Sequence, residues 1–215
     1  FGIPLKKIHI LPVGADTSKF KPILKEPNHP LIIGFYGGFI PLQGTKFIIE
    51  AANILKENNS VYFHLIGTGY EYEKMQKLVA ELNLKNIHFE GWVDYNELPA
   101  KIAGFDICLG IFGDTIKAKL VVPNKIYHYA AMGKPIITMD SPAIKEIFTE
   151  NKNIELVKNN GKELANRILK LASDKNKKIE LGKNARELAE SEFNEDKIAE
   201  KLVAIIKTTQ TKKGI

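Results

Sequence analysis

The amino-acid sequence predicts an α/β fold in three layers, with a six-stranded parallel sheet between two layers of helices. From residue 31 onward, short apolar runs alternate with amphipathic stretches, which is the pattern of strands that alternate with helices. The runs are apolar at successive positions, as in Leu31–Ile33, and this is typical of parallel strands that are buried on both faces.

Each apolar run is followed by a segment with helical periodicity, and three helices close the chain. The helix expected at 45–58 carries an apolar stripe, and Pro123 marks the end of an extended segment before the next polar helix start. Asp94 and Asn194 are residue types that cap helices. Strands are predicted at 31–36, 61–66, 87–89, 107–111, 135–139 and 154–157. Helices are predicted at 45–58, 71–82, 95–102, 124–132, 143–149, 162–172, 177–192 and 195–207. This order predicts a Rossmann-like three-layer sandwich.

Composition and charge narrow the class of protein. The 215 residues suffice for one domain with extensions, and 44% hydrophobic with 26% charged residues is ordinary for a soluble globular protein. The net charge of +6 comes with interleaved Glu residues, which favours a solvated helical surface over a nucleic-acid patch. No apolar run approaches the roughly 20 residues of a membrane span. The single cysteine, Cys108, is expected in the core and fits a reducing compartment.

The first 26 residues do not fit the alternation of strands and helices. Lys6–Val13 and Phe20–Pro22 have the pattern of a strand followed by a tether. We therefore expect three parts. These are an inter-domain strand and linker from a missing N-terminal domain at 1–26, the α/β domain at 27–193, and a closing helix and tail at 194–215.

Ligands of such sheets bind at the carboxyl ends of the strands, so the loops there are the candidate site. The loop at 37–44 leads into a helix, whose N-terminus offers free N–H groups to an anion. It is neither a P-loop nor a dinucleotide fingerprint, because Gly-Lys-Ser/Thr and Gly-x-Gly-x-x-Gly are absent. It predicts a phosphate cradle or a tight turn without a ligand. Gly67 and Gly69, after the second strand, leave the same two alternatives open.

The loop at 112–124 is the most polar of these loops. Lys117, Lys119 and Lys125 are expected to converge on a diphosphate. Lys125 would lie in the first turn of a helix capped by Asn124, which is the wrong end for a cation unless an anion is bound. The alternative is a flexible basic surface loop.

His128 shares a helix face with Asn124 and Lys125, so it is expected to point towards the cleft or solvent. It is either a plain surface residue or a hydrogen-bonding partner of a ligand hydroxyl. A metal site is not expected, because the five histidines are scattered and no paired cysteines occur. We also find no nucleophile elbow and no carboxylate pair with the spacing of an acid and a base.

Several short motifs, in order, resemble the donor-binding domain of family 4 (group 1) glycosyltransferases. The resemblance covers nearly the whole chain, and it begins with Val13-Gly-Ala-Asp16 and Phe20-Lys-Pro22 in the linker. The later motifs are Phe35–Gly44, Leu65–Gly69, Phe89–Val93, Ala103–Asp106 and Pro123–Ile137, followed by Glu146.

The resemblance implies the C-terminal half of a GT-B fold, which binds a nucleotide sugar, while a missing N-terminal domain binds the acceptor. It implies transfer from a UDP- or GDP-linked donor to a glycan, lipid or small molecule, with retention of configuration and without metal or other cofactor. Loop 37–44 would lie by the diphosphate, loop 90–95 by the base and His128 by the ribose. The implied donor-binding residues are Gly37, Gly38, Phe39, Gln43, Gly67, Gly69, Gly91, Trp92, Val93, Lys117, Lys119, Asn124, Lys125 and His128.

The chain departs from the family pattern at four charged positions. Phe39 and Gln43 replace an Arg and a Lys of the first loop, and Leu120 and His128 replace two glutamates. No catalytic residue is therefore assigned, and the three lysines are expected to supply the charge for the phosphates.

Two alternatives to a transferase follow from these departures. One is a non-catalytic nucleotide-sugar-binding or scaffolding module, and the other is a GT-B sugar-nucleotide epimerase. The fragment alone is expected to be inactive in transfer. The full-length enzyme is expected in the cytoplasm, with peripheral association at the membrane surface as an option and no nucleic-acid partner.

Overall fold

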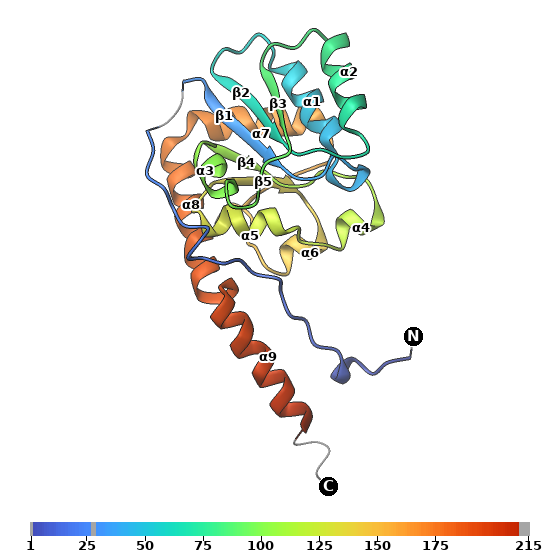
Figure 1. Ribbon diagram of the computed structural model, residues 1–215, viewed down its shortest axis with the longest axis vertical. Coiled ribbons are helices and arrows are strands. Elements are labelled where there is room, and N and C mark those ends of the chain that lie inside the picture. The colour runs from blue at the N-terminus through green and yellow to red at the C-terminus, as the bar shows by residue number, and fades with distance from the viewer. Residues whose placement is uncertain (1, 27–28, 211–215) are drawn as a thin grey trace.

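The computed structural model describes residues 2–26 and 29–210, and a six-stranded sheet lies at its centre (Figure 1). All neighbouring strands run parallel, in the order β3-β2-β1-β4-β5-β6. The predicted α/β class and the six predicted strands are confirmed, with ends shifted by no more than two residues. The strands are β1 (Leu31–Tyr36), β2 (Val61–Ile66), β3 (Ile87–Gly91), β4 (Ile107–Leu109), β5 (Ile136–Met139) and β6 (Glu155–Val157).

A hydrophobic core lies on each face of the sheet, which gives three layers (Figure 1). Alternate residues of β1 serve the two cores, since Ile33 and Phe35 are buried in one and Tyr36 packs against the other. Cys108 is buried in the second core, as predicted. The first core is covered by α1 (Thr45–Ile54), α2 (Tyr72–Glu81) and α7 (Gly161–Ser173). The second is covered by α3 (Leu98–Ala103), α5 (Asn124–Ala131), α6 (Pro142–Lys145) and part of α8 (Lys175–Leu188).

Capping residues decide where several helices begin. Asn194 caps the closing helix as predicted, because its Oδ1 accepts a hydrogen bond from the N–H of Lys197 at 2.8 Å. Asp94 does not cap a helix. Its Oδ1 accepts the N–H of Asn96 at 2.8 Å within a turn, and α3 begins only at Leu98. The ends of α1 and α6 also lie before the predicted boundaries.

Three short helices have no counterpart among the predictions, since three or four residues are too few to show a helical period. They are η1 (Leu5–Lys7), η2 (Pro41–Gln43) and α4 (Ile116–Lys119). The predicted N-terminal strand is wrong. In the described part of the linker, only an isolated bridge joins Ala15 to Asn194.

The closing helix α9 (Glu195–Gln210) projects away from the sheet, after a π-helical turn η3 (Ala189–Phe193) that follows α8 (Figure 1). Leu202, Val203 and Ile206 are 44–48% exposed. Nearly half of the surface of each of these apolar residues is therefore in contact with solvent. Among the helices of residues 2–26 and 29–210, none combines the length and the hydropathy that a membrane span requires.

Candidate functional site

The topological switch point of the sheet lies between β1 and β4. The chain passes from β1 to β2 and β3 on one side, and then returns to β4 on the other. Open parallel sheets bind ligands at the carboxyl ends of the strands next to such a switch. The loops after β1 and β4, at 37–44 and 110–123, border this point.

Two large hollows in the surface lie away from the glycine loops. One of about 610 Å³ runs along α9, and one of about 630 Å³ lies at the opposite edge of the sheet beside His29 and Lys178. Neither combines glycine loops, a helix N-terminus and a buried charge, so the chemistry locates the site rather than the size of a hollow. The described residues hold no group of three His, Cys, Asp or Glu side chains placed for a metal ion.

The two glycine loops pack backbone against backbone. A Cβ added to Gly67 would lie 2.0 Å from the carbonyl oxygen of Gly37, and one added to Gly69 would lie 2.7 Å from the backbone of Phe39. The N–H of Phe39 also donates to the carbonyl of Thr68 at 2.9 Å. Contact between the loops therefore accounts for Gly67 and Gly69 without any ligand.

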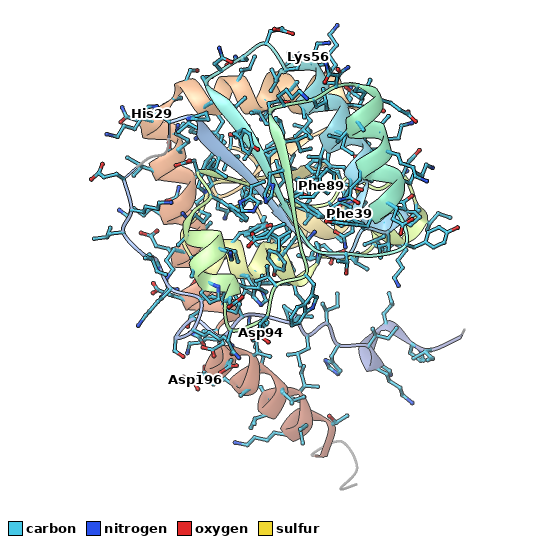
Figure 2. The ribbon with its side chains drawn as sticks, turned by 45° about the horizontal axis from the view of Figure 1, so that its top comes forward. His29, Phe39, Lys56, Phe89, Asp94 and Asp196 are labelled. Atoms are coloured by element: carbon cyan, nitrogen blue, oxygen red, sulfur yellow. The ribbon has the colours of Figure 1, made fainter. Side chains whose placement is uncertain are left out.

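The side chain of Phe39, a residue implied to bind the donor, lies in the first core rather than at the surface of the glycine loop. It is fully buried beside Phe89, with ring centroids 5.6 Å apart (Figure 2). Tyr72 meets the same ring edge-on at 5.0 Å. Phe39 cannot replace the Arg that the family has at this position, because no part of the Phe39 side chain reaches solvent.

The loop after β3 presents one large side chain to solvent. Gly91 ends the strand with a φ of +84°, a conformation that favours glycine. Trp92 is exposed, whereas Val93 packs against the second core. Of Gly91, Trp92 and Val93, which were expected beside the base, only Trp92 has a side chain that is exposed and aromatic.

Lys125 is an unusually placed amine at this edge of the sheet. Its residue is only 3% exposed, and its Nζ donates to Oε1 of Gln43 at 2.6 Å and lies 3.6 Å from the centre of the Phe35 ring. A Cβ on Gly37 would come within 2.6 Å of this Nζ, so the glycine makes room for the lysine. Within the described residues it has no carboxylate partner. Burial therefore holds the pKa of Lys125 well below its usual value.

The N-terminus of α5 lacks a side-chain cap. Asn124 was expected to cap it, but it is the first helical residue, and Pro123 at the cap position has no polar side chain. Helices α6, α7 and α8, in contrast, are capped by the side chains of Ser141, Asn160 and Asp174. The N–H of Ile126 donates to the carbonyl oxygen of Pro123 at 3.0 Å. No side chain caps the N–H groups of Asn124 and Lys125, which are therefore left for water or an anion.

The other two lysines of the predicted cluster do not share the environment of Lys125. Lys117 and Lys119 are exposed on α4, and Nζ of Lys119 lies 3.9 Å from a carboxylate oxygen of Asp114. The expected convergence of three lysines is therefore reduced to Lys125 at the glycine loop. Leu120, where the family has a glutamate, is exposed at the end of α4.

His128 is buried, contrary to the expectation that it points to the cleft or solvent. It is 9% exposed and stacks on Phe20, with ring centroids 3.8 Å apart and an interplanar angle of 6°. Its Nδ1 lies 2.5 Å from the hydroxyl of Tyr36. Burial, assisted by the charge of Lys19, lowers the pKa of His128 to about 4. No pattern in the sequence indicated that Phe20 of the linker would pack on this helix.

Stability should fall as the pH drops from about 6.5 towards 4. In that range the unfolded chain binds a proton at His128 that the folded chain excludes, so folding loses up to about 3 kcal/mol. Melting temperatures between pH 4 and 7 measure this slope, which should flatten in His128→Gln. His9→Gln, at an exposed histidine, is the matched control and should keep the wild-type slope. Equal slopes in wild type and His128→Gln would contradict the prediction.

A protein-family comparison decides which family the fold and loops represent. The family model described as "Glycosyl transferases group 1" matches residues 30–174. The chain belongs to this family. Sequence relatives of this group 1 domain include the poly(ribitol-phosphate) α-N-acetylglucosaminyltransferase of Staphylococcus aureus, 29% identical over 86% of this chain and 37% of that protein. Spore coat protein SA of Bacillus subtilis is 26% identical over 81% of this chain and 48% of that protein. This chain thus spans less than half the length of either relative.

Solved structures confirm the fold of the group 1 domain. The C-terminal domain of the group 1 glycosyl transferase LpcC from Francisella tularensis superposes with a TM-score of 0.72 at 22% identity, over 85% of this chain and 100% of that one. HepE from Anabaena, solved in complex with UDP-glucose, gives a TM-score of 0.76 at 17% identity, over 94% of this chain and 57% of that one. The fold is that of the C-terminal domain of a GT-B glycosyltransferase.

Proposed function

We propose that this chain is the donor-binding half of a retaining, metal-independent glycosyltransferase. It takes a sugar from a UDP- or GDP-linked donor for a glycan, lipid or small-molecule acceptor. The observation that carries the proposal is Lys125, a buried amine without a carboxylate partner in the described structure, beside the glycine loop and the uncapped start of α5. Both features favour an anion, and the diphosphate of a nucleotide sugar brings two adjacent phosphates to one place.

The arrangement suits departure of a nucleoside diphosphate. Negative charge develops on the leaving diphosphate as the sugar bond breaks, and a protonated Lys125 with the N–H groups of α5 would stabilise it. A Cβ added to Gly38 would have no atom closer than 3.9 Å, and Trp92 is exposed, so both residues leave room for a donor. Retention of configuration and independence from metal rest on the resemblance to family 4. The acceptor and its binding half belong to the longer protein that we propose.

A non-catalytic binding module remains the second candidate, and one observation favours it. The two family glutamates are absent, with an exposed Leu120 and a buried His128 at their positions. Acceptor-dependent turnover by the full-length protein would exclude this candidate. Product analysis without acceptor separates a transferase from an epimerase, because only the epimerase changes the stereochemistry of the sugar.

The first test is a melting experiment on this chain with UDP, GDP, UDP-glucose and GDP-mannose. A ligand present at 100 times its dissociation constant stabilises by about 2.7 kcal/mol, which corresponds to a rise of about 5–11 °C for a domain of this size. Uridine and guanosine, which lack the diphosphate, should give a much smaller shift. No shift with any of the four at millimolar concentration would refute the proposal.

A further inference from the structure

The linker covers the outer face of α5. Every residue of Lys125–Ala131 is buried, although a helix packed on a sheet normally leaves one face in solvent. Phe20 of the linker stacks on His128, with ring centroids 3.8 Å apart and an interplanar angle of 6°. Shortly before it, the backbone of Val13 hydrogen-bonds the hydroxyl of Tyr127. The linker therefore forms an outer wall that confines α5 between itself and the sheet.

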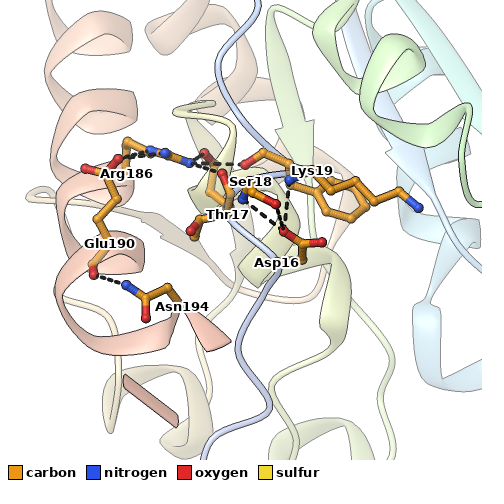
Figure 3. A network of polar contacts seen from close by, with 9 residues as sticks. Asp16, Thr17, Ser18, Lys19, Arg186, Glu190 and Asn194 are labelled. Carbon is orange, nitrogen blue, oxygen red and sulfur yellow. Dashed lines mark hydrogen bonds and ion pairs between the residues drawn. The ribbon is translucent and has the colours of Figure 1, made fainter. Parts of the chain in front are cut away.

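Arg186 on α8 fixes this wall to the far end of α5 (Figure 3). Its guanidinium group donates to the carbonyl oxygens of Thr17 and Phe20 at 3.4 and 3.1 Å. The same group donates to the carbonyl of Ala131, the last residue of α5, where a positive charge also suits the helix dipole. Glu190 orients the guanidinium group, since Nε donates to its Oε1 at 2.7 Å. One side chain therefore joins the linker, α5 and α8.

A second anchor joins the linker to the loop after β3. Nζ of Lys19 donates to Oδ1 of Asn96 at 2.7 Å and lies 3.9 Å from the centre of the Tyr95 ring. Oδ1 of Asp16 accepts the N–H groups of Ser18 and Lys19, each at 2.9 Å, which closes the linker into a turn (Figure 3). The turn keeps the linker compact between α8 and this loop.

The start of α5 tolerates little movement. Nζ of Lys125 is 2.6 Å from Oε1 of Gln43, and a Cβ on Gly37 would also come within 2.6 Å of it. A donor and an acceptor about 3.6 Å apart no longer form a hydrogen bond, so a shift of α5 by about 1 Å would break this contact. The place of the amine beside the glycine loop therefore depends on what holds α5.

We propose that Arg186 is a positioning residue of the donor site: through the linker it holds α5 in place, so that Lys125 stays beside the glycine loop. The inference rests on the proposed function, in which Lys125 and the uncapped start of α5 bind the diphosphate. The docked linker and the bound diphosphate both stabilise the same position of α5. Each therefore favours the other, as two coupled sites must.

Hydrogen–deuterium exchange tests the positioning without any nucleotide. Arg186→Met keeps the aliphatic stem and removes the guanidinium group. Backbone amides of the linker and of α5 should then exchange about 10-fold faster or more, which is the loss of one hydrogen bond to a charged group. Arg167→Met is the matched control, because Arg167 pairs with Glu155 on the edge strand β6. Unchanged exchange of α5 in Arg186→Met, or an equal acceleration in the control, would overturn the positioning role.

A milder variant keeps the test decisive if Arg186→Met does not fold. Asp16→Ala removes the carboxylate that closes the turn of the linker, and it leaves the side chains of α5 and α8 unaltered. Exchange should speed up in the same two segments, by a smaller factor. In that case wild-type exchange in Asp16→Ala would overturn the positioning role.

Affinity for UDP and GDP tests whether the position of α5 serves the diphosphate. Arg186→Met should weaken binding by about 5- to 150-fold, the usual range of coupling between two sites. In the Lys125→Met background the same change should cause a smaller loss, because the positioned amine is already gone. Wild-type affinity in Arg186→Met, or an equal loss in both backgrounds, would overturn the route through Lys125. Failure of wild type to bind either nucleotide would refute the proposed function instead, and the exchange data would still decide whether Arg186 holds α5.

Discussion

Replacement of Lys125 by Met should weaken binding of UDP or GDP by about 10- to 100-fold. A hydrogen bond to a charged group contributes about 1.5–3 kcal/mol, and Met matches the length of the aliphatic stem without the ammonium. Isothermal titration calorimetry measures the loss. Lys183→Met, at an exposed lysine on α8, is the control and should bind as wild type does. Wild-type affinity in Lys125→Met would show that the buried amine does not contact the nucleotide.

The pH dependence of stability and the uptake of a proton on binding test Lys125→Met in a second way. Because burial holds the pKa of Lys125 below its unfolded value of about 10.4, the unfolded chain binds the extra proton between those two pH values. The stability of wild type relative to Lys125→Met should therefore rise with pH across that window. A bound diphosphate favours the protonated amine, so binding should take up a proton. The binding enthalpy should then change with the ionisation enthalpy of the buffer in wild type, and much less in the variant.

Gly67→Ala should destabilise the chain by about 4 kcal/mol, which lowers the melting temperature by about 8–16 °C. The added Cβ would lie 2.0 Å from the carbonyl oxygen of Gly37, and the φ of +127° is strained for any L side chain. The neighbour is backbone rather than a flexible side chain, so one of the two glycine loops must move. Thermal unfolding followed by circular dichroism measures the change.

The matched control for Gly67→Ala lies in the facing loop. In Gly38→Ala the new Cβ would have no atom closer than 3.9 Å, so the melting temperature should stay within about 2 °C of wild type. Similar losses in the two variants would mean that the loops do not pack as described.

Much of the fold was accessible from hydrophobic periodicity, because the sheet is buried on both faces. The first strand is apolar throughout, and β1 runs from Leu31 to Tyr36 as predicted. The wrong predictions concern helix ends and caps, which depend on single hydrogen bonds. Asp94 has the chemistry of a cap, yet its carboxylate closes a turn with Asn96 instead. Periodicity carries no information on such a choice.

The candidate site was predictable only in outline. The order of strands and loops places Gly37, Lys125 and the start of α5 at one edge, and the sequence indicated that edge. It did not indicate that Lys125 is buried against Gln43, or that His128 is turned inward beneath Phe20. Those arrangements depend on long-range packing, since Phe20 and His128 are far apart in the chain. The spacing of residues along one helix predicts only which of them share a face of that helix.

The open surroundings of Gly38 give protein engineers a position at which charge can be put back. The residue after it, Phe39, occupies the family's Arg position but belongs to the core, so an Arg placed there would have to break an aromatic cluster. A Cβ added to Gly38 would have no atom closer than 3.9 Å. A library built at this one position can therefore place a cation on the loop, and tighter binding of UDP or GDP by such a variant would show that the loop can hold a charge beside a diphosphate.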